Sequence, residues 1–169
     1  MPLESWTRTQ MAPRWGTLQR EPDAFFDSIV EMMCSSLDAP ISMISIIQNN
    51  YHFVRASHGL PALVRADGEL PISHSICQHV VGMGRPLVVA DAMAHPLVRN
   101  NPSVAEDNIA AYLGEPLHAA NGVPCGTLCV LDTRPRDWRE KERRMISITA
   151  MIVEKALGWP DGVQDFPVN

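Results

Sequence analysis

The side chains best suited to chemistry gather in one short stretch, residues 73–79. His74 and Cys77 stand three residues apart. On a helix this spacing puts both side chains on one face, where an imidazole and a thiolate could bind a metal ion. His79 lies about 160° from Cys77 around the same helix and points elsewhere. The stretch offers two metal ligands at most, so no metal site is predicted.

Two further thiols, Cys125 and Cys129, fall on one face of a predicted strand. Four residues at about 3.3 Å each separate them by roughly 13 Å, which is beyond the reach of one metal ion. Together with Cys34 and Cys77 they form none of the short paired spacings of zinc ribbons or thioredoxin-like sites. In a cytosolic protein we expect all four to be free thiols that pack as small apolar side chains.

The start of the short helix is a second chemical feature. Ser73 can cap a helix over residues 74–81, which Gly82 and Gly84 would end. The unpaired backbone N–H groups of a first turn carry partial positive charge. They predict an anion or a ligand rich in hydrogen-bond acceptors in front of this helix.

Composition indicates an acidic globular protein. The 169 residues suit one domain with short extensions, and 14 Lys and Arg against 19 Asp and Glu give a net charge of −5. This balance argues against electrostatic binding to nucleic acid. The apolar runs are too short to span a bilayer, and the first residues lack the pattern of a secretory signal. We therefore expect a cytoplasmic protein with neither nucleic acid nor membrane as a partner.

Local patterns predict the elements that hold these residues. A helix begins around residues 21–23 and continues to residue 37. Its buried side is expected to carry Phe25, Phe26, Ile29, Met32, Met33 and Leu37. Residues 41–47 and 51–56 are predicted to form a hairpin, with His52, Val54 and Ala56 on one strand face. His52, and His58 in the loop that follows, are expected at the surface.

A second hairpin is predicted around Asn121 and Gly122, a pair that readily supplies positive φ in a tight turn. The apolar runs on either side, within residues 111–136, are expected at the centre of the sheet. Residues 86–90 predict a short buried strand, and residues 57–73 and 91–108 are long connections near one sheet edge. Such loops often cover a site in compact domains.

The last helix, residues 138–157, has clear boundary signals. Asp137 and Glu140 have capping-box spacing, Gly158 suits a left-handed cap and Pro160 blocks continuation. Its apolar side chains spread over roughly 200°, wider than one sheet requires. They are Met145, Ile146, Ile148, Ala150, Ile152, Val153, Ala156 and Leu157. The excess predicts a second contact, with the first helix or with another copy of the chain.

These elements predict an α+β fold, an antiparallel sheet with helices collected on one face. Residues 1–20 are expected to be an N-terminal extension, residues 21–158 the domain, and residues 159–169 a C-terminal tail.

Several motifs together resemble the GAF domain family, the small sensory modules of bacterial signalling proteins. The motifs are Ala39-Pro-Ile-Ser42, Ser75-Ile-Cys-Gln-His79, Val89-Ala-Asp-Ala92, residues 95–102, and the closing hairpin with Tyr112-Leu-Gly-Glu-Pro-Leu117 and Gly126-Thr-Leu-Cys-Val130. The resemblance covers roughly residues 21–158. It is strongest to the short modules found beside bacterial histidine kinases and diguanylate cyclases.

The resemblance implies a GAF-like central antiparallel sheet with the N- and C-terminal helices on one face, and loops plus the short helix on the other. It implies signal transduction without catalysis, through a small molecule bound between the sheet and the connections 57–73 and 91–108. It also implies a homodimer through the terminal helices and a signalling protein as partner. The sequence identifies neither the ligand nor any cofactor.

The resemblance also implies which residues meet the ligand. His74 is expected to donate to it, Cys77 to form a wall one turn on, and Tyr112 to present its phenol. Glu115 replaces the small residue of many relatives, so it is either an acceptor or a group that selects against anions. Ser75 and Cys129 complete the expected ligand-binding set. The alternative is that Ser73 only caps the helix, His74 faces water and Tyr112 belongs to the core.

Other functions stay open. An interaction module with a vestigial pocket, whose output is dimerisation, is the main alternative. A redox enzyme similar to the free methionine sulfoxide reductases is disfavoured, because those GAF relatives use loop cysteines and these cysteines fall on predicted helices and strands. Covalent bilin attachment is disfavoured because residues 91–109 contain no Cys. The Asn-Lys-x-Phe-Asp-Glu signature of cyclic-nucleotide-binding GAF domains is absent as well.

Overall fold

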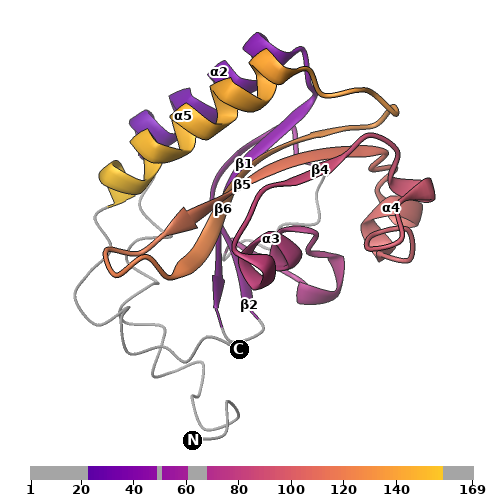
Figure 1. Cartoon of the computed structure of the whole chain (residues 1–169), viewed down its shortest axis with the longest axis horizontal. Coiled ribbons are helices and arrows are strands. Elements are labelled where there is room, and N and C mark those ends of the chain that lie inside the picture. Colours follow the sequence, from indigo (N-terminus) through magenta and orange to yellow (C-terminus); the bar gives the residue numbers. More distant parts are fainter. Residues whose placement is uncertain (1–22, 49–50, 61–67, 158–169) are drawn as a thin grey trace, which may run out of the picture.

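Six antiparallel strands form one sheet in the part of the chain that this computed structural model describes, residues 23–48, 51–60 and 68–157 (Figure 1). Their order across the sheet is β3-β2-β1-β6-β5-β4. The strands are β1 (Ile41–Gln48), β2 (Tyr51–His58), β3 (Glu69–Leu70), β4 (Leu87–Val89), β5 (Ala111–His118) and β6 (Pro124–Asp132). Both predicted hairpins, β1-β2 and β5-β6, are confirmed.

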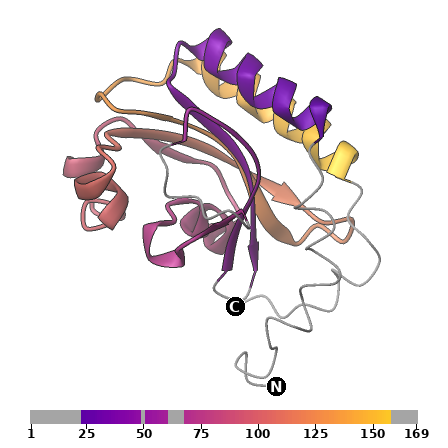
Figure 2. The same ribbon diagram turned by 180° about the vertical axis from the view of Figure 1, so that it is seen from behind.

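Helices cover both faces of this sheet. The long helices α2 (Ala24–Leu37) and α5 (Glu140–Leu157) lie side by side on one face, as Figures 1 and 2 show from opposite sides. The short helices α3 (Cys77–Met83) and α4 (Pro102–Glu106) lie on the other face, with 3-10 turns at Ile72–His74 and Ala92–Ala94. The predicted α+β arrangement is confirmed.

Because both faces are covered, the central strands are apolar on both sides and two cores result. Val30, Leu113 and Ile146 belong to the core beneath α2 and α5. Met43, Val80 and Tyr112 belong to the core on the opposite face. Neighbouring residues Tyr112 and Leu113 of β5 therefore point to different cores, as strand alternation requires.

Helix α2 begins where its acid side chain predicts. Asp23 is the N-cap, and its carboxylate accepts from the backbone N–H groups of Phe25 and Phe26. The predicted buried side was too wide, because Phe25 is 45% exposed and Met32 is 41% exposed. The sheet covers a narrower stripe that includes Val30 and Cys34 instead.

Helix α5 begins two residues later than its predicted capping box implied. Glu142 Oε2 accepts from the Arg139 backbone N–H at 2.8 Å, so the reciprocal contact forms between these residues and not between Asp137 and Glu140. The predicted cap at Gly158 lies outside the described residues. So do the predicted N-terminal extension over residues 1–20 and the tail over residues 159–169.

A bulge in the β1-β2 pairing changes the predicted strand faces. Ile44 pairs with Ala56, yet the next residue, Ser45, pairs with Val54, so Arg55 is the extra residue. Ala56 therefore packs in the core beneath the helices, whereas Val54 packs in the opposite core. The prediction that His52, Val54 and Ala56 share one face was wrong for Ala56.

The closing hairpin turns as predicted at Gly122, whose φ is 83°. The Ala119 backbone N–H donates to Val123 O at 2.8 Å, which closes the turn. Its strand β6 is central and pairs with β1, but β5 lies second from the sheet edge. The expectation that the whole hairpin forms the centre was therefore half right.

The outward face of α5 carries an apolar stripe. Ile148 is 60% exposed and Met151 is 65% exposed, and Met145 and Ile152 are also exposed. Ile146 and Val153, by contrast, are fully buried against the sheet. The over-wide apolar surface seen in the sequence thus divides into a core stripe and an outward stripe.

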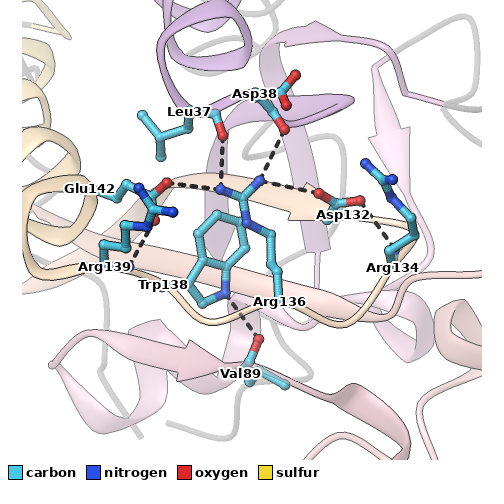
Figure 3. Close-up of polar contacts among 9 residues, drawn as sticks. All are labelled: Leu37, Asp38, Val89, Asp132, Arg134, Arg136, Trp138, Arg139 and Glu142. Atoms are coloured by element: carbon cyan, nitrogen blue, oxygen red, sulfur yellow. Dashed lines mark hydrogen bonds and ion pairs between the residues drawn. The ribbon is translucent and has the colours of Figure 1, made fainter.

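Arg136 ties the two long helices to the sheet (Figure 3). Its guanidinium donates to the carbonyl oxygens of Leu37 and Asp38 at the end of α2, at 2.9 and 3.0 Å. It also contacts the carboxylates of Asp132 on β6 and Glu142 on α5, at 3.2 and 2.8 Å. One cation therefore joins three elements.

Trp138 extends this junction to the sheet edge. The Arg136 guanidinium stacks 4.3 Å from the centre of its ring. The indole N–H donates to Val89 O on β4 at 3.0 Å, as Figure 3 shows.

No helix in the described part of the chain is long and apolar enough to cross a membrane.

Candidate functional site

A small pocket lies on the sheet face opposite α2 and α5. Its walls come from strands β1, β3, β5 and β6 and from the connections around the 3-10 turn and α4. They are Met43, Leu60, Leu70, His74, Ile76, Ser103, Asp107, Ile109, Tyr112 and Leu131. The cavity volume is about 30 Å³. This is room for a few water molecules, far below the roughly 300–1,000 Å³ of pockets that enclose drug-sized ligands.

One end of this pocket is polar. His74 Nε2 lies 2.8 Å from Glu106 Oε2, and His74 Nδ1 lies 3.0 Å from Ser73 Oγ. Next to Glu106, the Asp107 Oδ2 atom is buried and has no hydrogen-bond partner among the described residues. Burial raises the pKa of Asp107 above its usual value, an effect that His74 partly offsets. A buried carboxylate oxygen without a donor favours a ligand or water that brings one.

Behind the pocket lies a buried sulfur cluster. The Tyr112 hydroxyl donates to Cys77 Sγ at 3.2 Å, and Cys77 Sγ lies 3.8 Å from Cys129 Sγ. All three side chains are 0% exposed. The ring of Tyr112 has room because Gly114 follows two residues later, where a Cβ atom would lie 2.4 Å from the Tyr112 hydroxyl oxygen.

The thiols of the cluster differ in acidity. Burial opposes ionisation of Cys77, but the neighbouring polar side chains, Cys129 foremost and the hydrogen-bonded Tyr112 hydroxyl with it, outweigh burial and lower the pKa of Cys77 to about 7. Burial raises the pKa of Cys129 well above its usual value. Of the two thiols, Cys77 is therefore the one that forms a thiolate more readily.

His52 corrects a prediction, because its side chain is fully buried and not at the surface. Its Nε2 lies 2.7 Å from Ser45 Oγ and its Nδ1 lies 2.8 Å from Ser75 Oγ. Burial lowers the pKa of His52 to about 3, so the ring is neutral and links the two hydroxyls. Alternation along β2 points it to this face, and no sequence signal marked the serines as its partners.

The predicted single helix over residues 74–81 is two elements. His74 ends the 3-10 turn, Ser75 is extended with φ −83° and ψ 110°, and α3 begins at Cys77. Ser75 Oγ, not Ser73, accepts from the Gln78 backbone N–H at 3.1 Å. That donor is already satisfied, and His74 faces acidic groups, so the expected anion in front of this helix has no support here.

The structure brings two of the six predicted ligand residues to the pocket, His74 and Tyr112. Ser75, Cys77 and Cys129 are fully buried and lie behind the pocket wall. Tyr112 contributes its ring to the wall, while its hydroxyl is directed to Cys77.

The prediction that Glu115 contacts the ligand needs correction. It points to the helix-covered face, because it is an odd-numbered residue of β5 like Leu113 and Leu117, which pack in that core. Burial raises the pKa of Glu115, and its charged neighbours there are His118 and Glu154 of α5. It therefore does not line the pocket. Sequence reasoning missed Asp107 and Ser103, although both fall in the connection 91–108 that was expected to cover a site.

Metal ligands do not converge in the described residues. No group of three or more His, Cys, Asp or Glu side chains there could hold an ion. His74 and Cys77, expected on one helix face, diverge because Ser75 interrupts the helix between them.

Known proteins match this architecture. The family model of the GAF domain matches residues 21–157. This chain belongs to the GAF domain family. It is therefore a sensory and regulatory module of the kind that this family provides.

One relative of this GAF domain is a cyclic di-GMP phosphodiesterase of Pseudomonas aeruginosa, 34% identical over 154 residues. The match covers 90% of this chain but only 25% of the relative, so the chain spans about a quarter of that enzyme.

Solved structures share the fold at low identity. The GAF domain of a phosphoenolpyruvate-protein phosphotransferase from Coxiella burnetii has a TM-score of 0.66 and 19% identity, covering 86% of this chain and 88% of that one. Free methionine-R-sulfoxide reductase from Neisseria meningitidis, in complex with its substrate, has a TM-score of 0.64 and 16% identity, covering 89% of each chain.

Proposed function

We propose that this GAF domain is a cytoplasmic sensory module that binds a small molecule in the pocket between the sheet and the connections 57–73 and 91–108. It acts without catalysis and passes the signal to a partner protein. The observation that carries the proposal is the buried Asp107 oxygen, which lacks a donor at the polar end of an otherwise apolar pocket. A ligand with an N–H or O–H group would satisfy it.

The pocket's size and charge narrow the ligand class. Glu106 and Asp107 outnumber His74 at the polar end, so a neutral or cationic donor fits better than an anion. The cavity of about 30 Å³ means that a ligand larger than a few atoms requires its walls to move apart. Binding would then change the packing behind the wall, where Tyr112 contacts Cys77.

A thermal-shift screen with metabolites and ions tests this function. A ligand that binds only the folded state stabilises it by RT ln(1 + [L]/Kd), about 2.7 kcal/mol at one hundred times Kd. The shift should fall in Asp107→Asn and His74→Ala and persist in His58→Ala, a matched control at an exposed histidine. Hits that shift all four proteins equally, or a broad screen without hits, would contradict the proposal.

A second candidate function rests on a separate observation, the outward stripe of α5. A run of exposed Ile and Met side chains on a helix favours a protein contact. In this alternative the pocket is vestigial, and the output is a homodimer through the terminal helices. The cyclic di-GMP phosphodiesterase relative supports, for either function, a partner that is a signalling enzyme.

A further inference from the structure

Cys77 and Cys129 form a close pair within the described structure. Their sulfurs are 3.8 Å apart, and a disulfide bond is about 2.05 Å long, so they need to approach by roughly 1.8 Å. The other two cysteines have different surroundings: Cys125 Sγ contacts Leu117 O, and Cys34 lies on α2.

The two cysteines differ in how firmly their elements are held. Cys129 lies on β6, which pairs along its length with β1 on one side and β5 on the other. Cys77 is the first residue of α3, a seven-residue helix that follows an extended residue and a 3-10 turn. Cys129 is therefore the more firmly anchored of the two residues, and an approach made by movement at the start of α3 leaves the pairing of β6 in place.

The cluster is within one side chain of the pocket. Two neighbours of Cys77 line the pocket: Ile76, which precedes it in the chain, and Tyr112, whose hydroxyl is hydrogen-bonded to it. Hydrogen peroxide, a molecule slightly larger than water, fits a cavity of this volume. A small oxidant could reach the sulfurs by a limited displacement of these two side chains.

We propose that Cys77 and Cys129 are a reversible dithiol–disulfide pair that a small peroxide oxidises, with Cys77 as the attacking sulfur and Cys129 as the resolving sulfur. The pair is a redox modification site that ties α3 to the central strand behind the pocket. This proposal does not require the pocket to bind a ligand.

The two steps balance. The Cys77 thiolate attacks one oxygen of hydrogen peroxide, forming an S–O bond as the O–O bond breaks, and the departing hydroxide takes up the Cys77 proton as water. The Cys129 sulfur then attacks the Cys77 sulfenic acid, forming the S–S bond as the S–O bond breaks. The second hydroxide leaves with the Cys129 proton as a second water. Two thiols lose two electrons, and one peroxide becomes two waters.

The surroundings assign these roles. The donors around Cys77 favour its thiolate, and the Tyr112 phenol stays protonated because burial and the neighbouring sulfurs raise its pKa well above the usual value. Ser45, whose hydroxyl also lowers the Cys77 pKa, is in turn bonded to His52. The attacking sulfur of Cys77 thus lies at the end of a buried polar chain. For Cys34 and Cys125, by contrast, burial raises the thiol pKa and disfavours the thiolate.

Mass spectrometry tests the proposal on the full chain. The reduced protein is treated with a small excess of hydrogen peroxide, quenched in acid, alkylated under denaturing conditions and digested. We expect alkylation to fall from four cysteines to two per chain, with one cross-linked peptide pair that joins Cys77 to Cys129. Dithiothreitol should restore all four thiols, and the protein should remain a single-chain band on a non-reducing gel.

Variants separate the two roles. In Cys129→Ser, Cys77 should be trapped as a sulfenic acid by dimedone, whereas in Cys77→Ser, Cys129 should stay reduced under the same conditions. The matched control Cys125→Ser should form the cross-link at the wild-type rate. Because the wild-type cross-link is measured without any substitution, misfolding of a variant leaves the main test intact.

Three results would overturn the proposal. One is a wild-type protein that keeps four alkylatable thiols in peroxide that fully oxidises glutathione. Another is oxidation of Cys34 or Cys125 before the pair. The third is conversion of Cys77 to a sulfinic acid without a bond to Cys129.

Discussion

The buried residues Ser75, His52 and Ser45 form a continuous hydrogen-bonded chain that ends beside Cys77. A neutral imidazole is well suited to this position, because it offers one donor and one acceptor to two hydroxyls that can rotate. His52 of β2 therefore links Ser75, in the segment before α3, to Ser45 of β1. Protonation is opposed because it would place a positive charge in a fully buried site.

His52 predicts a pH-dependent stability. The folded protein keeps this ring neutral down to a pKa of about 3, whereas the unfolded chain binds a proton below about pH 6.5. The unfolded state therefore holds more protons between these values, so stability is full above pH 6.5 and is lost as pH falls. The contribution to the slope approaches about 1.4 kcal/mol per pH unit.

Urea unfolding at pH 7, 6, 5 and 4.5 measures this slope. His52→Gln, which does not titrate, should show a slope smaller by about one proton, whatever its stability at pH 7. Parallel slopes in the two proteins would show that His52 does not control the acid response.

Gly114 predicts a second residue-scale effect. In Gly114→Ala the new methyl group would meet the Tyr112 ring, and we expect a loss of about 1–3 kcal/mol, since overpacking of a filled core costs this much. In a Tyr112→Leu background the same change should cost much less, because the obstructing ring is gone. Equal costs of Gly114→Ala in both backgrounds, measured by chemical unfolding, would assign the penalty to the strand backbone instead.

At the scale of elements, the Arg136 junction holds α2, β6 and α5 together. Its two backbone acceptors belong to Leu37, the last residue of α2, and to the C-cap Asp38, where the helix dipole favours a cation. Asp132 is 3% exposed, so removing Arg136 leaves a buried carboxylate without its main cation. The junction is therefore a structural point at which both long helices respond to one side chain.

Arg136→Met should destabilise the fold by about 2–4 kcal/mol, the range for breaking a largely buried ion pair and its hydrogen bonds. Arg144→Met is the matched control, because Arg144 makes an exposed pair with Glu140 that should contribute at most about 0.5 kcal/mol. Denaturant unfolding of both variants gives the comparison. A similar small loss in the two would mean that solvent already screens the Arg136 contacts.

The elements show what the sequence could and could not predict. Hairpins β1-β2 and β5-β6, helices α2 and α5 and the α+β class follow from alternation, helical spacing and turn residues, which are local. The bulge at Arg55 is not local, because it depends on how β2 aligns with β1. The break at Ser75 was missed because residues 73–81 fit one capped helix in sequence, whereas in the structure Ser75 is extended and its hydroxyl contacts the distant His52.

The candidate site was harder to predict than the fold for the same reason. The connection 91–108 was expected at the pocket and supplies Ser103 and Asp107, and His74 and Tyr112 also lie there. Which side chain turns inward depends on strand phase, which placed Glu115 on the opposite face. The short contact between Cys77 and Cys129 joins residues 52 positions apart and has no signature in sequence spacing.

At the scale of the whole molecule, the α2–α5 layer covers one sheet face and leaves its own outer surface partly apolar. Phe25 and Met32 of α2 are exposed as well as the outward stripe of α5. This layer is the opposite side of the molecule from the pocket (Figures 1 and 2). A contact there would not obstruct a ligand.

Ile148→Glu and Met151→Glu test the homodimer. If the outward stripe pairs with its copy, each substitution buries a charge at the interface and should convert dimers to monomers in sedimentation velocity. Met93→Glu, at a methionine that is 77% exposed on the other side of the sheet, is the control. Ile146→Glu and Val153→Glu are unsuitable, because both side chains are in the core. A wild-type sedimentation profile in both stripe variants would exclude this helix face as the dimer contact.

The antiparallel packing of α2 and α5 determines where segments of a larger assembly would connect to this domain. Arg136 joins the end of α2 to the first turn of α5, so the start of α2 and the end of α5 lie at the same far end of the layer (Figure 1). A segment that enters at Ala24 and one that leaves at Leu157 therefore start as neighbours. Sliding of one helix along the other would move these two segments in opposite directions along the helix axes.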